Sequence, residues 1–319
     1  MPGGQPRPAT FSIVARDPDR DAVGVAVHSK FVSVGSVVPF AAADAGAVAT
    51  QSFANVDYGP DGLELLREGH TAAETVEALT EDDPEREQRQ VGVVGADGTV
   101  AAFTGEDCFD YAGDRQGDGY TVQGNILENA ETLEAMADAY ERSASPRDTD
   151  AGDGLPERLL AALQAGNEAG GDSRGEQSAA LYVVEPEGGY DGRGDRWIDV
   201  RVDDHDDPID ELERVFKLYD VTLLSRAEPT ETRPLEGATA EAVLETLADL
   251  GFYEETPGTE FGEPERAALE EFRGMNNFEN HDLPVVEDAL ARGWDRAEGT
   301  GEARMVDAVW HGLSRLERE

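Results

Sequence analysis

The sequence has very little positive charge, and almost none of it is lysine. Lysine and arginine together number 26, against 69 aspartates and glutamates, and the formal net charge is −43. Lys30 and Lys217 are the only lysines. A protein that binds nucleic acid needs a basic stripe to neutralise phosphates, so the composition excludes a nucleic-acid partner.

Cysteine and long apolar runs are also scarce. Cys108 is the single cysteine, so no disulfide can form within the chain, and we interpret it as a small, partly buried side chain. The most apolar stretch, residues 34–50, is interrupted by Pro39 and Asp44 and is too short to cross a membrane. The first nine residues lack the apolar core of a signal peptide. We therefore expect an unsecreted, cytoplasmic protein without a membrane partner.

Carboxylates are what the sequence has in abundance. Repulsion among so many like charges destabilises a compact state in dilute buffer. At molar salt the Debye length is about 3 Å, and most of this repulsion is screened. An acidic disordered chain is the alternative, but 39% of the residues are hydrophobic and they fall in periodic blocks. The composition thus predicts a folded, salt-adapted (halophilic) protein.

The length of 319 residues favours two domains. The polar, proline-containing stretch 225–237 is typical of a linker, so the predicted domains are residues 1–224 and residues 238–319. A second polar run, residues 143–154, predicts a surface loop within the first domain.

The first domain alternates groups of strands with pairs of helices. Hairpin-spaced strands are too close in sequence for the crossovers that parallel pairing needs, so the sheets should be antiparallel with helix layers covering them. This order predicts an α+β fold, a four-layer αββα sandwich. The predicted strands are residues 10–15, 23–27, 34–40, 46–52, 90–94, 99–104, 120–123 and 178–184, and the predicted helices include residues 128–142 and 155–166. A further helix should open at Thr71, where Thr71 and Glu74 form a capping box.

The second domain shows only helical periodicity and predicts a small all-α unit of three or four helices. The predicted helices are residues 238–250, 263–272, 283–291 and 303–316.

Five sequence blocks give the first domain a family resemblance. They are TFSIVARDP (10–18), GVAVHSKFVSVG (24–35), GAVATQSFANVDYG (46–59), QGN (123–125) and GGDSRGEQSAAL (170–181). In these blocks the chain resembles domain-of-unknown-function family 1028, whose fold is that of the N-terminal-nucleophile (Ntn) hydrolases. The second domain resembles a peptidoglycan-binding-like helical domain through DLGFY (249–253) and ALEEFRGMNNFEN (268–280). A cytoplasmic protein would not meet peptidoglycan, so we interpret this domain as a helical packing or oligomerisation module.

The resemblance implies that Thr10 is the candidate nucleophile. In many relatives the equivalent threonine directly follows the initiator methionine, whereas here nine residues precede Thr10. The hydroxyl of a terminal threonine attacks a carbonyl while its own α-amine takes the proton. This chemistry requires cleavage after Ala9, by self-processing or by a peptidase. The alternative is that Thr10 is simply the first β-branched residue of a strand.

Two further residues are candidates for the catalytic centre. Lys30 follows the second strand, and a cation near the nucleophile would lower the pKa of the amine or the hydroxyl. Asn125 could donate a hydrogen bond to an oxyanion. A surface lysine and a turn-forming asparagine are the alternative interpretations.

Six residues are candidates for substrate binding. Arg174 could bind a substrate carboxylate while Asp172 orients the amine, or the two could form a structural ion pair. The full set is Gln51, Asn55, Asp172, Arg174, Gln177 and Ser178. The five histidines show no metal-ligand spacing, so we expect neither a metal nor a cofactor.

Two functions remain open. The chain is either an Ntn-type amidohydrolase that acts on a small amide through Thr10, or a non-catalytic protein of the same fold that binds a ligand or partner with residues 1–9 intact. A small-molecule substrate is the expected partner, and a homo-oligomer is plausible from the helical domain.

The charge predicts how the protein responds to salt. Dialysis from concentrated salt into dilute buffer should abolish the folded structure, because the repulsion among carboxylates is no longer screened. Circular dichroism measures the change, and a spectrum that stays the same in dilute buffer would contradict the salt adaptation.

Overall fold

The computed structural model describes residues 10–143 and 154–318, and it divides into two compact units. The first unit extends to Glu213, and the second begins at Arg214, within helix α5 (Pro208–Leu223). Residues 1–9 and nearly all of the predicted loop at 143–154 lie outside the described residues. Within the predicted linker, Leu235 is buried in the core of the second unit.

The first unit contains two antiparallel sheets. Hairpins connect strands that follow one another in sequence, and two longer connections bring the chain back to the six-stranded sheet. The six-stranded sheet runs β10 (Arg196–Val202), β9 (Ser178–Val184), β2 (Ala22–Ser29), β1 (Thr10–Asp17), β8 (Tyr120–Asn125) and β7 (Gly113–Gly117). The four-stranded sheet runs β3 (Pro39–Ala42), β4 (Gly46–Ser52), β5 (Arg89–Gly95) and β6 (Val100–Thr104). Both sheets are antiparallel, as predicted from the short connections.

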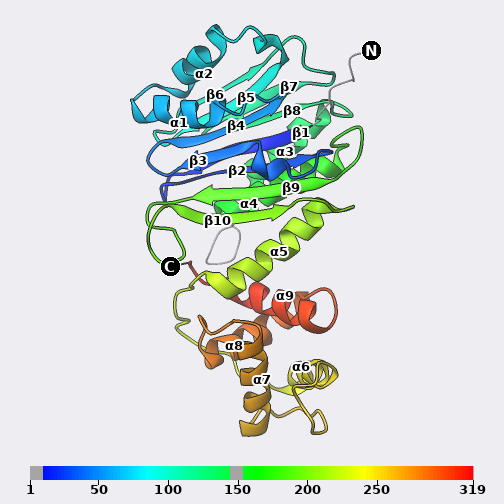
Figure 1. The fold of residues 1–319 in the computed structure, drawn as a ribbon. Helices are drawn as coiled ribbons and strands as arrows, with labels where there is room; N and C mark the ends of the chain where they lie inside the picture. Colours follow the sequence, from blue (N-terminus) through cyan, green and yellow to red (C-terminus); the bar gives the residue numbers. More distant parts are fainter. Residues whose placement is uncertain (1–9, 144–153, 319) are drawn as a thin grey trace. The chain divides into compact units, whose positions relative to one another are not determined.

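Pairs of helices cover the outer faces of the two sheets (Figure 1). Helices α1 (Tyr58–Arg67) and α2 (Ala72–Glu81) pack on the four-stranded sheet. Helices α3 (Glu131–Ser143) and α4 (Leu155–Glu168) pack on the six-stranded sheet. The first unit is therefore a four-layer αββα sandwich, which confirms the predicted fold class.

Local sequence signals were correct at some positions and wrong at one. The Thr71 side chain accepts a hydrogen bond from the Glu74 amide and Glu74 bonds back to Thr71, so the predicted capping box opens α2. The strand predicted at residues 34–40 is wrong, because residues 34–36 form a 3₁₀ turn and β3 begins only at Pro39. Ser33 enters this turn in the left-handed region (φ 56°), which an extended strand does not allow.

The layer between the two sheets changes from apolar to polar along the strands. At one end, valines and alanines of both sheets form a core. At the other end, where β1 begins, buried polar side chains replace them, including Ser12, Gln51, Gln90 and Gln123. The sheets approach closely here because Gly92 has no side chain. A Cβ atom at Gly92 would lie 2.3 Å from Oε1 of Gln123.

The second unit is helical, as predicted, and it has its own core. Large buried side chains such as Phe272, Phe278 and Trp294 fill the centre of this core. Its helices, besides the end of α5, are α6 (Gly237–Asp249), α7 (Glu263–Met275), α8 (Leu283–Gly293) and α9 (Gly301–Leu313).

Two buried aspartates organise the arginines of the second unit. Asp220 is 1% exposed and binds Arg226, Arg318 and the indole N–H of Trp310. Although burial opposes ionisation, Arg318 and Arg226 lower the pKa of the Asp220 carboxyl. Asp288 is fully buried and pairs with Arg292 and Arg315. A buried carboxylate is tolerated only when it is paired in this way.

None of the helices in the described part of the chain is both long enough and apolar enough to cross a membrane.

Replacing Gly92 with alanine should destabilise the first unit. The new methyl group would displace the Gln123 amide, and overpacking of this kind costs about 1–3 kcal/mol in the free energy of unfolding. Denaturant unfolding in concentrated salt measures the loss. Gly258→Ala is the matched control, because a Cβ atom there meets nothing within 4 Å. Equal stability of the two variants would contradict the close approach of the sheets at Gly92.

His28 is a buried histidine on the helix-facing side of β2. It is 0% exposed and lies against the ring of Phe11, with centroids 4.7 Å apart. Neither ring nitrogen has a hydrogen-bond partner among the described residues, and the Glu176 carboxylate lies 3.7 Å from Nε2. Burial, together with the Lys30 ammonium, lowers the pKa of His28 from 6.5 to about 3. The folded state therefore holds this ring neutral.

Because of His28, the free energy of unfolding should fall as the pH is lowered. Between pH 6.5 and about pH 3 the unfolded chain binds a proton at His28 and the folded chain does not. The free energy of unfolding should thus fall by up to about 1.4 kcal/mol per pH unit as the pH drops through this window. In His28→Phe this component should be missing. Denaturant unfolding of both proteins between pH 7 and 4 measures the difference in slope, and parallel curves would refute the assignment.

Candidate active site

Thr10 begins β1, a central strand of the six-stranded sheet, and it is 2% exposed. Its cross-strand neighbours are Ser29 on β2 and Asn125 on β8, and Ser29 in turn pairs with Ser178 on β9. Paired residues on neighbouring strands share a face, so four polar side chains lie in a row across the sheet. Within this row, Oγ1 of Thr10 lies 3.1 Å from Oγ of Ser29.

A pocket of about 460 Å³ opens beside Thr10. One side of it is apolar and comes from the segment around the 3₁₀ turn, including Phe31, Val34 and Val38. The other side comes from the ends of β4 and β5. It is lined by Gln51, Ser52, Phe53, Ala54, Glu85, Gln88 and Arg89. Thr10 thus lies between an apolar wall and a more polar one.

Buried amides below the pocket form a continuous hydrogen-bonded network. Gln90 is its centre: Nε2 lies within hydrogen-bond distance of Thr104 Oγ1 (3.0 Å), Gly113 O (3.1 Å) and Gly124 O (2.8 Å). Its Oε1 accepts from Nε2 of Gln51 at 2.8 Å and from Nδ2 of Asn125 at 3.0 Å.

The network continues from Gln51 to the start of β1. Gln51 also donates toward the backbone oxygen of Thr10 at 3.4 Å and accepts a hydrogen bond from the Ser12 hydroxyl at 2.6 Å. Gln123 donates to Oγ of Ser12, again at 2.6 Å. The two sheets are therefore joined by side-chain hydrogen bonds next to the candidate nucleophile.

Asn125 has one polar atom that the network does not satisfy. The residue is 1% exposed, and its Oδ1 has no hydrogen-bond partner among the described residues. Buried polar atoms in folded proteins are nearly always paired, so this oxygen stands out.

At this end of the sandwich, the backbone adopts the left-handed conformation at the points where two strands end. Ser52 follows Gln51 with φ 69°, and Ile126 follows Asn125 with φ 53°. Such a conformation is costly for a residue with a side chain, and for isoleucine in particular. Backbone strain of this kind gathers at functional sites, where the surrounding structure enforces it.

Lys30, Asp172 and Arg174 come together next to the row. The Asp172 carboxylate accepts hydrogen bonds from the backbone N–H groups of Lys30 and Arg174, both at 2.9 Å. The Arg174 guanidinium binds the same carboxylate, with Nη2 at 3.1 Å from Oδ2. Nζ of Lys30 donates to the backbone oxygen of Glu176 at 2.6 Å. None of these three residues lines the pocket of Thr10.

The remaining predicted residues take different positions. Ser178 accepts from the backbone N–H of Val34 at 3.1 Å and donates to the backbone oxygen of Phe31, so it holds the apolar wall in place. Gln177 donates to Asp204 at 3.0 Å. Asn55 faces a separate, acidic depression of about 610 Å³ beside α1 and α2. Of the nine predicted residues, Thr10 and Gln51 line the pocket of Thr10.

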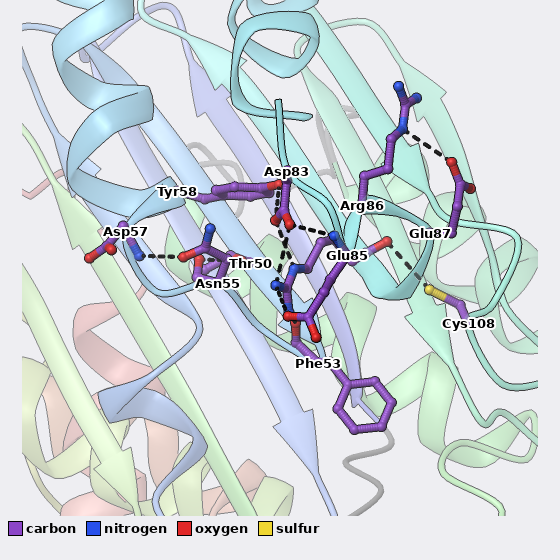
Figure 2. Close-up of polar contacts among 11 residues, drawn as sticks. Thr50, Phe53, Asn55, Asp57, Tyr58, Asp83, Glu85, Arg86, Glu87 and Cys108 are labelled. Carbon is purple, nitrogen blue, oxygen red and sulfur yellow. Dashed lines mark hydrogen bonds and ion pairs between the residues drawn. The ribbon is translucent and has the colours of Figure 1, made fainter. Parts of the chain in front are cut away.

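Sequence reasoning missed the cluster around Arg89. Its guanidinium binds Asp83 at 2.9 Å and Glu85 at 2.8 Å, and Asp83 also accepts from the Tyr58 hydroxyl at 2.7 Å. Figure 2 shows Tyr58, Asp83, Glu85 and Phe53 gathered here. Although burial opposes it, hydrogen bonds from Arg89 and Tyr58 lower the pKa of Asp83 well below its usual range. The sequence feature that could have indicated this cluster is Arg89 itself, which stands at the start of a strand and four residues after Glu85 in a chain poor in cations.

Cys108 lies next to the pocket lining, where its thiol donates to the backbone oxygen of Arg89 at 3.4 Å. Cys108 is buried, and burial raises the pKa of its thiol, so it is not poised as a nucleophile. Within residues 10–143 and 154–318, no group of three or more His, Cys, Asp or Glu side chains is placed to hold a metal ion.

Comparisons with known proteins agree with the architecture. A family model described as "Family of unknown function (DUF1028)" matches residues 10–212. A second, described as "Putative peptidoglycan binding domain", matches residues 222–309. No curated protein is similar enough to be matched to the chain.

A solved structure supports the first of these matches. The crystal structure of a protein from Silicibacter pomeroyi, itself described as DUF1028, is 32% identical to this chain with a TM-score of 0.58. The similarity covers 66% of this chain and 86% of that one. By sequence and by structure, the chain belongs to the DUF1028 family.

Proposed function

We propose that the protein is an amidohydrolase of the N-terminal-nucleophile type, which cleaves a small amide with the Thr10 hydroxyl. The observation that carries the proposal is the position of Thr10. It is the first residue of a central strand and it lines a pocket, beside a buried row of polar side chains. A terminal threonine at this position would have both its hydroxyl and its amine at the ligand.

The reaction requires that the chain begin at Thr10. Water adds across the peptide bond between Ala9 and Thr10, which releases residues 1–9 and leaves a free α-amine. The Thr10 hydroxyl then attacks the substrate carbonyl, and its proton passes to the α-amine. The resulting ammonium protonates the leaving amine as the C–N bond breaks. A water molecule, deprotonated by the same α-amine, hydrolyses the acyl ester and restores Thr10.

Neighbouring residues support this chemistry. Nδ2 of Asn125 carries two hydrogens, of which one goes to Gln90, and we assign the other to the oxyanion of the tetrahedral intermediate. Lys30 follows Ser29 and supplies positive charge at this end of β2; it already lowers the pKa of His28. Gln51 holds the backbone of Thr10 in place.

The pocket favours an amide with a compact apolar acyl group. Phe31, Val34, Val38 and Phe53 offer apolar contact. Among the described residues of the lining, the cation is Arg89, which is bound by Asp83 and Glu85. A substrate carboxylate would therefore find no available charge partner in this lining.

We extend the proposal to the setting of the enzyme. The charge of −43 supports a salt-rich cytoplasm, and the separate core of the helical unit supports a role in packing or self-association rather than in contact with peptidoglycan.

The proposal predicts that the chain is cleaved before Thr10 and that Thr10 can then be acylated. Full-length protein purified from concentrated salt should have the mass of residues 10–319, and a p-nitrophenyl ester of a short apolar acid should acylate Thr10. Thr10→Val keeps the shape of the strand residue but lacks the hydroxyl, so turnover should fall by at least about three orders of magnitude. Intact-mass spectrometry and ester hydrolysis measure the two effects.

Thr10→Ser is the matched control, because it retains a hydroxyl and should still be acylated. Turnover by Thr10→Val equal to that of the unmodified protein would overturn the proposal. Retention of residues 1–9 together with a lack of acylation would favour instead a non-catalytic ligand-binding protein of the same fold.

A further inference from the structure

We propose that Oδ1 of Asn125 forms a buried ammonium-binding site beside Thr10, and that its ligand is the α-ammonium group of a chain that begins at Thr10. The inference rests on the proposed function in one respect, namely that Thr10 becomes the first residue. It makes Asn125 a positioning residue for the amine, in addition to the oxyanion contact assigned to Nδ2.

The orientation of the Asn125 amide follows from that of Gln90. The Gln90 side-chain nitrogen faces two backbone carbonyl oxygens and the Thr104 hydroxyl, so exchanging its N and O would set oxygen against oxygen. Gln90 Oε1 must therefore face the donors, which are Gln51 and Asn125. Since Asn125 presents its nitrogen to Gln90, its oxygen is fixed on the other side.

This oxygen lacks a donor although the side chain that carries it is buried. Asn125 is 1% exposed, and Oδ1 has no partner among the described residues. Leaving such an acceptor unpaired destabilises the folded state, and buried polar atoms in folded proteins are nearly always paired. An incoming donor would remove this destabilisation.

Thr10 is placed to supply that donor. It is the direct cross-strand neighbour of Asn125, and side chains in such pairs lie about 5 Å apart at Cβ. The Thr10 hydroxyl lies 3.1 Å from Oγ of Ser29 and is not within hydrogen-bond distance of Oδ1 of Asn125, so the hydroxyl does not supply the missing hydrogen bond. Cleavage before Thr10 converts a backbone N–H into an ammonium group with three hydrogens, which is the new donor at this position.

A neutral acceptor suits an amine that must act as a base. A carboxylate here would hold the ammonium so strongly that its pKa would rise above the working range, whereas an amide oxygen orients it without a full opposing charge. The pocket agrees, since within the described part of its lining the one carboxylate is that of Glu85, which binds Arg89.

The first test is spectroscopic and needs no variant of the site. The protein used lacks residues 2–9, so that Thr10 follows the initiator methionine, which an aminopeptidase removes; this deletes none of the described residues. With ¹³C and ¹⁵N labels, the Thr10 amine and the side-chain carbonyl carbon of Asn125 are titrated together. The inference expects the Asn125 signal to shift with the midpoint of the Thr10 amine. An Asn125 signal that stays flat through that midpoint would overturn it.

The second test removes the acceptor. In Asn125→Leu the ammonium loses its hydrogen bond while Gln90 keeps Gln51 as a donor, so the pKa of the Thr10 amine should fall by about one unit, a tenfold change in its proton affinity. Thr121→Val is the matched control. It removes a hydrogen bond to Gln123 from the same strand and layer, and it should leave the amine pKa unchanged. The same amine pKa in Asn125→Leu and in the unmodified protein would refute the site.

The two proposals fail differently. The amine pKa and the Asn125 signal are measured without any substrate, so a protein that binds its ammonium but hydrolyses nothing would overturn the proposed function alone. A protein that hydrolyses amides with an Asn125 signal that does not titrate would overturn the ammonium site alone.

Discussion

The rest of the first unit depends on satisfying the buried amides between its two sheets. Gln90 fixes the arrangement, because its nitrogen is surrounded by acceptors and its oxygen by donors. The pairing holds the start of β1 against the ends of β4 and β5, and Gly92 provides the space that Gln123 needs. A core of valine and alanine joins the sheets elsewhere, but such a core would place no hydrogen-bonding groups beside Thr10.

Much of the fold could be predicted because its signals are local. Alternating apolar residues marked β1 and β2, the Thr71 capping box marked α2, and the short spacing of strands required antiparallel sheets. The error at residues 34–40 has a clear cause. Val34 and Val38 are buried as strand residues would be, but Val34 lies in a 3₁₀ turn that Ser178, distant in sequence, holds in place, and Val38 follows that turn.

The candidate site was predictable only in part, because its contacts are long-range. Thr10 could be identified from the position that begins β1, and Asn125 and Gln51 from the family blocks. The partners of these residues could not: Gln90 and Arg89 look like ordinary polar strand residues until the two sheets are stacked. The same limit applies to Arg174, which the sequence left open between a ligand contact and a structural pair; in the structure it binds Asp172.

The buried ion pairs of the helical unit have a consequence for the carboxylates elsewhere in the chain. Four of the 24 arginines pair with Asp220 and Asp288 inside the unit, and Lys217 pairs with Asp307. Because these cations bind carboxylates of the same helical unit, they are not available to pair with carboxylates elsewhere in the chain.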